Sequence, residues 1–145
     1  MDHFSNGFAT NSYNYSDAVN GINWNWAITN NKTVSSVRDM IELKKDHRAF
    51  FSQSNGTNII NNVIFKGTGN NTLLAYEITP DSSKTITESW SKVLVLQNSA
   101  NSTASYNLTG EWYNGYSNGI YTTNPQIISS SVEVPAKGTV ILFQY

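Results

Sequence analysis

The sequence predicts a mainly β protein: an antiparallel β-sandwich or barrel, preceded by a long loop and one α-helix. Three observations support this prediction. Residues 1–33 show hardly any regular hydrophobic period, residues 34–51 follow a helical period, and from residue 62 onward apolar residues alternate in short segments separated by turn residues. The length of 145 residues fits a single domain, or one domain with part of another.

The first segment, residues 1–33, is predicted to be mostly loop. It is rich in Asn and aromatic residues and contains Gly7 and Gly21, while Trp24 and Trp26 stand two apart as on one face of a short extended piece. A loop of about 30 residues is uncommon inside a compact domain. We therefore expect this segment to be a functional rim or to adjoin an incomplete neighbouring domain.

A helix is predicted for residues 34–51. A spacing of 100° per residue gathers a broad apolar arc on one side and most of the charged residues on the other, with Lys44 as the main exception. Thr33 is the predicted N-cap, and the lysines fall in the second half, where the helix dipole favours them. An arc this wide is expected to be buried on two sides. The arc contains Val34, Val37, Met40, Ile41, Leu43, His47, Phe50 and Phe51, and the opposite face contains Arg38, Asp39, Glu42, Lys45, Asp46 and Arg48.

Seven short strands are predicted after a polar connector. The strand at 92–98 is apolar on both faces for most of its length, so it is expected to be central in its sheet. The predicted division is 1–52 for the loop and helix, 53–61 for the connector and 62–145 for the sandwich. The strands are expected at 63–66, 72–79, 92–98, 103–108, 111–116, 126–134 and 139–144.

Composition excludes several partners. Only 13% of the residues are charged, the net charge is −1, and the Lys and Arg residues are scattered. This argues against nucleic acid, which requires a basic surface, and no apolar run approaches the roughly 20 residues of a membrane span. The absence of Cys rules out disulfides and thiolate metal sites within this sequence. A neutral surface rich in hydroxyl and amide groups suits sugars better.

The titratable residues form no recognisable catalytic pattern. A glycosidase needs two facing carboxylates, but Asp39, Glu42 and Asp46 are expected on a solvated helix face, and Glu77, Glu88, Glu111 and Glu133 are scattered over strands and turns. His3 and His47, the two histidines, have no metal-ligand spacing, and His47 is expected to be a hydrogen-bonded core residue. No nucleophile elbow or phosphate loop is present. We therefore expect no metal and no cofactor.

Aromatic residues are the remaining candidates for ligand contact, because their rings can stack on sugars. For Trp90 and Trp112 core or edge packing is favoured over ligand binding, because sandwiches bury large aromatics. For Tyr13 and Tyr15, which lie in the irregular Asn-rich loop, both interpretations stay open.

The loop and helix resemble the end of the catalytic barrel of the α-amylase superfamily, glycoside hydrolase family 13, and especially its type I pullulanases. The resemblance lies in N-S-Y-N-Y-S-D-A-V-N-G-I-N-W at 11–24 and in I-E-L-K-K-D-H-R-A-F at 41–50. It continues in L-L-A-Y-E at 73–77, K-V-L-V-L-Q-N at 92–98 and V-P-A-K-G-T-V-I-L at 134–142. In two places the sequence departs from the family pattern: Arg48 stands where proline is usual, and Thr10 where a charged residue commonly precedes N-S-Y.

The resemblance implies that the chain is a C-terminal portion of such an enzyme: the last loop and helix of a (β/α)8 barrel, followed by an antiparallel β-sandwich of the Greek-key type, called domain C. A barrel of this kind takes about 250 residues, and the family's three catalytic acids lie on earlier strands. The chain alone is therefore expected to be inactive, and its parent enzyme is expected to be extracellular or at the cell surface. Asn11, Tyr13 and Asn14 match the family's substrate-facing rim and are the candidate α-glucan contacts.

Two functional hypotheses follow. In the first, helix and sandwich seal and stabilise the missing barrel of a starch-debranching enzyme that cleaves α-1,6 bonds, and the isolated chain either covers the exposed helix face with residues 1–33 or self-associates. In the alternative, the chain is a free-standing carbohydrate-binding module that uses Trp90, Trp112 and neighbouring tyrosines.

Overall fold

Residues 23–145 are described by the computed structural model of the protein. The chain divides into two compact units, residues 1–35 and 36–145. The described part of the first unit holds helix α2 (Asn25–Thr29) and the start of helix α3 (Asn31–Asp46). The second unit holds the rest of α3, two short helices and all the strands. The predicted domain assignments of 1–52 and 62–145 stay predictions.

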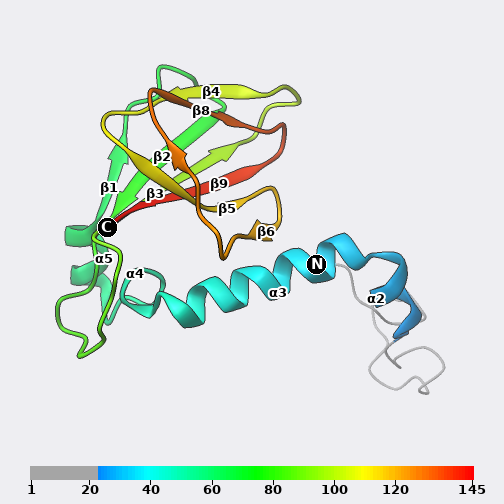
Figure 1. Cartoon of the computed structure of the whole chain (residues 1–145), viewed down its shortest axis with the longest axis horizontal. Helices are drawn as coiled ribbons and strands as arrows, with labels where there is room; N and C mark the ends of the chain where they lie inside the picture. The colour runs from blue at the N-terminus through cyan, green and yellow to red at the C-terminus, as the bar shows by residue number, and fades with distance from the viewer. Residues whose placement is uncertain (1–22) are drawn as a thin grey trace. The chain divides into compact units, whose positions relative to one another are not determined.

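The second unit is an antiparallel β-sandwich, as predicted, with one large and one small sheet (Figure 1). In the large sheet the strand order is β1-β2-β3-β9-β5-β6, and β7 pairs with β5; the small sheet is formed by β4 and β8. Strands β3 and β9 pair with each other in the large sheet, and strands β4 and β8 pair with each other in the small sheet. The chain therefore crosses to the small sheet directly after β3 and crosses back directly before β9. The strands are β1 (Val63–Lys66), β2 (Leu73–Ile78), β3 (Lys92–Asn98), β4 (Ala104–Asn107), β5 (Trp112–Ser117), β6 (Ile120–Tyr121), β7 (Ile127–Ile128), β8 (Ser131–Val134) and β9 (Thr139–Gln144).

Strands β3 and β9 are buried on both faces, which confirms the predicted central position of 92–98. Along β3, Leu94 and Leu96 point into the space between the two sheets, where they pack with residues of β4 and β8. Their neighbours Val93 and Val95 point to the other face, where they pack with residues of the helical segment. The large sheet therefore has two cores, one shared with the small sheet and one shared with the helices.

The second core contains the helical segment. Leu43 of α3 and Phe50 of α4 (Arg48–Phe51) are 3% and 2% exposed and pack with Ile141 and Phe143 of β9. In Figure 1 the helical segment after residue 35 lies on the face of the large sheet opposite β4 and β8. The helices after residue 35 are thus part of the sandwich unit.

The predicted loop at 1–33 contains helix α2, so Trp24 and Trp26 do not lie on an extended piece. The helical predictions differ from the structure in three further ways. Helix α3 begins at Asn31, so Thr33 lies within its first turn and is not the N-cap. The helix is also interrupted at His47, whose backbone leaves the helical region with φ −119° and ψ 52° before α4 begins. Finally, the predicted connector contains helix α5 (Gly56–Asn62), capped by the Asn55 side chain, which accepts a hydrogen bond of 2.9 Å from the Asn58 amide.

The strand predictions were largely confirmed, with two corrections. The predicted strand at 126–134 is split into β7 and β8, because Ser130 adopts a positive φ of 71° that breaks the extended backbone. The two-residue strand β6 was missed because it is too short to show a period. Within the described residues, no helix is long and apolar enough to cross a membrane.

Candidate functional site

Tyr121 of β6 joins the sandwich to helix α3 through both its backbone and its side chain. Its backbone N–H donates to Asp39 Oδ2 at 3.1 Å, and its hydroxyl donates to Asp46 Oδ2 at 3.2 Å. Burial, together with the negative charge of Asp46, raises the pKa of Tyr121 to about 12. Asp46 is exposed, as expected for a solvated helix face, whereas Asp39 is half-buried. Both carboxylates also bind the sandwich, which the sequence did not indicate.

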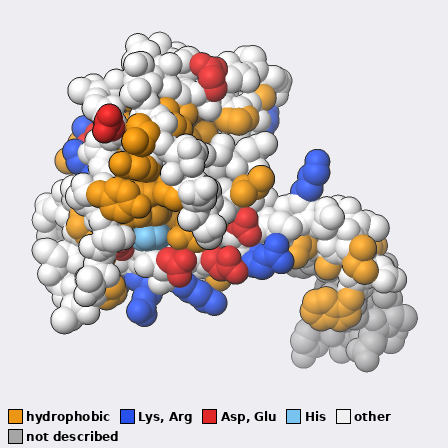
Figure 2. All heavy atoms as spheres, in the orientation of Figure 1, with side chains coloured by type: hydrophobic (Ala, Val, Ile, Leu, Met, Phe, Trp, Pro, Cys, Tyr) orange, Lys and Arg blue, Asp and Glu red, His pale blue; other side chains and the backbone are white. Residues whose placement is uncertain are grey.

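His47 lies at the break between α3 and α4 and is held from three sides. Its Nδ1 lies 2.8 Å from Glu88 Oε1, its Nε2 lies 3.2 Å from the Tyr121 hydroxyl, and its ring stacks on Trp90 with centroids 3.3 Å apart. This confirms the predicted hydrogen-bonded core histidine. In Figure 2 acidic side chains gather beside the histidine coloured pale blue.

Glu88 was predicted to be one of several scattered acids, but it is a buried anchor. Its side chain is 8% exposed, and its Oε1 also accepts the backbone N–H groups of Ser89 and Trp90 at 3.0 and 3.3 Å. Its Oε2 is buried and has no hydrogen-bond partner among residues 23–145. The carboxylate is committed to holding His47 and its own loop, which is a structural arrangement.

A second buried carboxylate, Asp81, fixes the other end of the helical segment. It accepts hydrogen bonds from the backbone N–H of Ser54 at 2.7 Å, from Asn58 Nδ2 at 2.8 Å, and from the Ser83 hydroxyl at 2.6 Å. Its own amide donates to the Ala49 carbonyl at 2.8 Å. The hydrogen bonds from Ser54 and Ser83 hold the pKa of Asp81 well below its usual range. The loop between β2 and β3 thus fastens the helical segment at two points, Asp81 and Glu88.

Gly119 lets the turn between β5 and β6 approach helix α3 closely. It has a φ of +89°, and a Cβ placed on it would collide with the Ser36 hydroxyl. A residue with a side chain would be strained there for both reasons. The contacts that residues 36–47 make with the sandwich therefore hold this part of the helical segment in place.

Part of the apolar arc of α3 is left uncovered by residues 23–145. Val37, Met40 and Ile41 are 53%, 50% and 48% exposed. Met40 and Ile41 follow Val37 by three and four residues, which places them on the same side of the helix as Val37. The sequence predicted that the arc is buried on two sides, and the sandwich buries one of them. Val37, Met40 and Ile41 form an exposed apolar surface on the other side, which we call the α3 face.

The candidate sugar contacts have different outcomes. Asn11, Tyr13 and Asn14 lie outside the described residues, so their assignment as substrate contacts stays a prediction. Trp90 and Trp112 are 6% and 4% exposed and belong to the two cores. They cannot present their rings to a sugar, so the alternative of a carbohydrate-binding module loses the two tryptophans on which it depended.

Several carboxylates from residue 23 onward make structural contacts. Glu77 is paired with Lys66 at 2.9 Å, while Asp81 and Glu88 hold the helical segment. No three His, Cys, Asp or Glu residues among the described ones are grouped to hold a metal ion.

Sequence reasoning missed Tyr121, Glu88 and Asp81 as joining residues. The partners of Glu88 and Tyr121 at His47 are 41 and 74 positions away in the chain, and no local pattern records such distances. Helix α5 did have a local signal, because Asn55 precedes Gly56 and Asn58 as an N-cap would.

These features define a class: an antiparallel β-sandwich with a helix locked onto one sheet. Solved structures of this class include the pullulanase from Bacillus acidopullulyticus, with 26% sequence identity and a TM-score of 0.82 over 97% of this chain. Type I pullulanase from Bacillus subtilis str. 168, complexed with maltose, has 24% identity and a TM-score of 0.77 over 92%. Pullulanase from Anoxybacillus sp. LM18-11, complexed with maltotetraose, has 24% identity and a TM-score of 0.75 over 93%. The resemblance to type I pullulanases is therefore confirmed.

The chain spans only 17 to 18% of the length of these three pullulanases. No protein-family model matches the sequence. No curated protein matches it either.

Proposed function

We propose that this chain is the C-terminal portion of a pullulanase-like α-glucan debranching hydrolase, and that its helix and sandwich seal and stabilise the catalytic barrel of that enzyme. In this proposal α3 is the last barrel helix and the sandwich is domain C. The reaction is hydrolysis of α-1,6-glucosidic bonds, and its catalytic carboxylates lie in the rest of the enzyme.

The observation that carries this proposal is the two-sided character of helix α3. One side is fixed to the sandwich by the hydrogen bonds of Asp39, Asp46 and His47. The other side leaves Met40 and Ile41 about half exposed. A rigidly held helix with an uncovered apolar side is suited to a further protein layer, because burying that side removes apolar surface from water.

The carboxylates support a structural role. Those that the sandwich unit brings together serve to hold α3 and the loop between β2 and β3, as Asp39, Asp46, Asp81 and Glu88 show. A glycosidase needs a pair of carboxylates facing a substrate cleft. In the proposed enzyme Asn11, Tyr13 and Asn14 contact α-glucan only when the barrel supplies the opposite wall of the site.

A complementation experiment tests the proposal. The chain is mixed with a type I pullulanase truncated to lack the matching segment, and association and hydrolysis of pullulan are measured. We expect the chain alone to be inactive and the mixture to associate and regain activity. The double variant Met40→Glu, Ile41→Glu should weaken association at least tenfold, because it places two charges on the α3 face.

The matched control is Ile127→Glu, which also replaces an exposed apolar residue, 56% accessible, but on strand β7. It should associate like the unaltered chain. Hydrolysis of pullulan by the chain alone, or association that the double variant does not weaken, would contradict the proposal. We propose that the isolated chain, without the barrel, self-associates through the α3 face. Sedimentation of the unaltered chain and of the same variants measures this self-association.

A further inference from the structure

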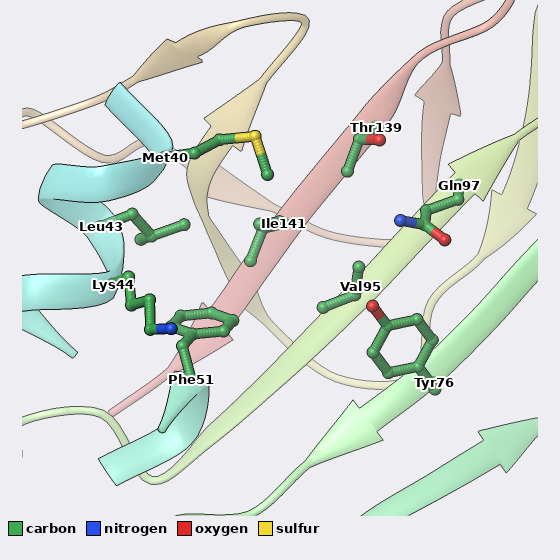
Figure 3. Close-up of a pocket in the computed structure, with 9 residues that line it drawn as sticks. All are labelled: Met40, Leu43, Lys44, Phe51, Tyr76, Val95, Gln97, Thr139 and Ile141. Carbon is green, nitrogen blue, oxygen red and sulfur yellow. The ribbon is translucent and has the colours of Figure 1, made fainter. Parts of the chain in front are cut away.

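Beside the α3 face the sandwich unit has a small hollow with an apolar floor (Figure 3). The floor is formed by Leu43 of α3, Val95 of β3 and Ile141 of β9, and Met40 and Phe51 stand at its helical side. The hollow has a volume of about 190 Å³. A cavity of about 150 Å³ lined by apolar side chains accepts benzene, so this one has room for a single aromatic ring.

Three polar groups stand around this floor: the Lys44 ammonium, the Tyr76 hydroxyl and the Gln97 amide. Among residues 23–145 none of the three has a hydrogen-bond partner. The Tyr76 hydroxyl is protonated at neutral pH, as in any ordinary tyrosine, and can donate. Burial raises the pKa of Tyr76 further. All three groups can donate hydrogen bonds, and backbone carbonyls would be suitable acceptors.

We propose that this hollow receives one aromatic side chain of the catalytic barrel, with the backbone carbonyls next to that side chain accepting hydrogen bonds from Lys44, Tyr76 and Gln97. This inference rests on the proposed function, because the barrel is the partner in both. Met40 lies in the hollow and on the α3 face, so a partner that covers the face reaches the hollow without a gap.

Size and chemistry favour a side chain over other occupants. Pockets for independent small ligands usually exceed about 300 Å³, which is more than this hollow offers. A sugar ring that entered the hollow would bury hydroxyl groups of its edge against Leu43, Val95 and Ile141, where they would lose hydrogen bonds to water without replacement. An aromatic ring has no such groups on its faces and gains by leaving water.

The first arm of the test probes the hollow without the barrel. The full chain is titrated with p-cresol, which carries the ring of a tyrosine side chain, and the methyl NMR signals of Val95 and Ile141 are followed. We expect saturable shifts of both signals. Maltose, titrated in the same way, should leave them unchanged. The variant Thr139→Phe places a ring at the rim of the hollow and should weaken p-cresol binding at least tenfold; Thr103→Phe, at an exposed position before β4, is the control.

The second arm measures association of the same variants with the truncated pullulanase. Thr139→Phe should weaken association at least tenfold and Thr103→Phe should not. Normal association of Thr139→Phe would overturn this inference and leave the proposed function standing. If p-cresol binds but no form of the chain associates, the proposed function fails and the inferred occupant fails with it. Shifts with maltose and none with p-cresol would overturn the aromatic assignment.

Discussion

The ring of His47 lies parallel to the indole of Trp90, with centroids 3.3 Å apart and an angle of 15° between the planes. Trp90 in turn stacks on Phe143 of β9 at 3.9 Å. The break between α3 and α4 is therefore joined to strand β9 of the large sheet by a continuous stack of aromatic rings. Its polar edge is completed by Glu88 and Tyr121.

Removing the Tyr121 hydroxyl should loosen this junction. In Tyr121→Phe the Asp46 carboxylate and His47 Nε2 each lose a partner, and a hydrogen bond to a charged group contributes about 1.5–3 kcal/mol. Because Tyr121 is partly exposed and water can replace its hydroxyl, we expect a loss of about 1–2 kcal/mol in the free energy of unfolding, measured with urea. Tyr106→Phe is the control, because the Tyr106 hydroxyl has no hydrogen bond within residues 23–145. If both variants lowered the free energy of unfolding equally, the hydrogen bonds of the Tyr121 hydroxyl would contribute nothing to stability.

Asp81 should make the stability of the protein sensitive to acid. Its folded-state pKa lies below the ordinary value of 3.8, so its hydrogen bonds stabilise the fold above pH 3.8, and this contribution is lost as the pH falls below that value. Asp81→Asn should be less stable at neutral pH and should lose less stability between about pH 5 and about pH 3 than the unaltered protein. Glu133→Gln, at an exposed position of β8, should keep the original acid sensitivity. A parallel pH dependence of Asp81→Asn and the unaltered protein would refute this role.

The approach of Gly119 to Ser36 can be tested with alanine. Gly119→Ala should lower stability for two reasons, the strained positive φ and the collision with the Ser36 hydroxyl. Gly69→Ala is the matched control, because Gly69 has a φ of +64° but no atom near its Cβ position. It should cost only the backbone term of about 1–2 kcal/mol, and Gly119→Ala should cost more in thermal or urea unfolding.

Restoring space beside residue 119 separates the two causes. Ser36→Ala removes the colliding oxygen, so in the double variant with Gly119→Ala part of the lost stability should return. If the stability losses of the two single variants simply added up in the double variant, the collision would not contribute to the loss. Helix α3 would then move away from residue 119 at no cost in free energy.

The helical segment should unfold together with the sheets. Phe50 is 2% exposed in the core shared with β9, so Phe50→Ala should cost about 3–5 kcal/mol, as large core truncations do. Ile41→Ala, where the side chain is 48% exposed, should cost much less. Near-ultraviolet circular dichroism and tryptophan fluorescence should report one transition, whereas two separate transitions would show that the segment folds independently.

Local pattern predicted much of the fold but little of the junction. The strands at 63–66, 92–98 and 139–144 were predicted with their observed bounds, because alternation and turn residues are local properties. The interruption at His47 was missed, because it depends on contacts with Glu88 and Tyr121 that form only after the sheet has assembled. Propensity alone continues the helix through this point.

By itself, the sequence determined the antiparallel sandwich, the central position of β3, the existence of an amphipathic helix and the resemblance to type I pullulanases. Each of these is recorded in the spacing or order of neighbouring residues. Only the tertiary structure decided which carboxylates hold the helix, that Trp90 and Trp112 are core residues, and which part of the apolar arc stays exposed. The physical reason is that strand register and helix placement bring distant side chains together, and those contacts determine burial and hydrogen bonding.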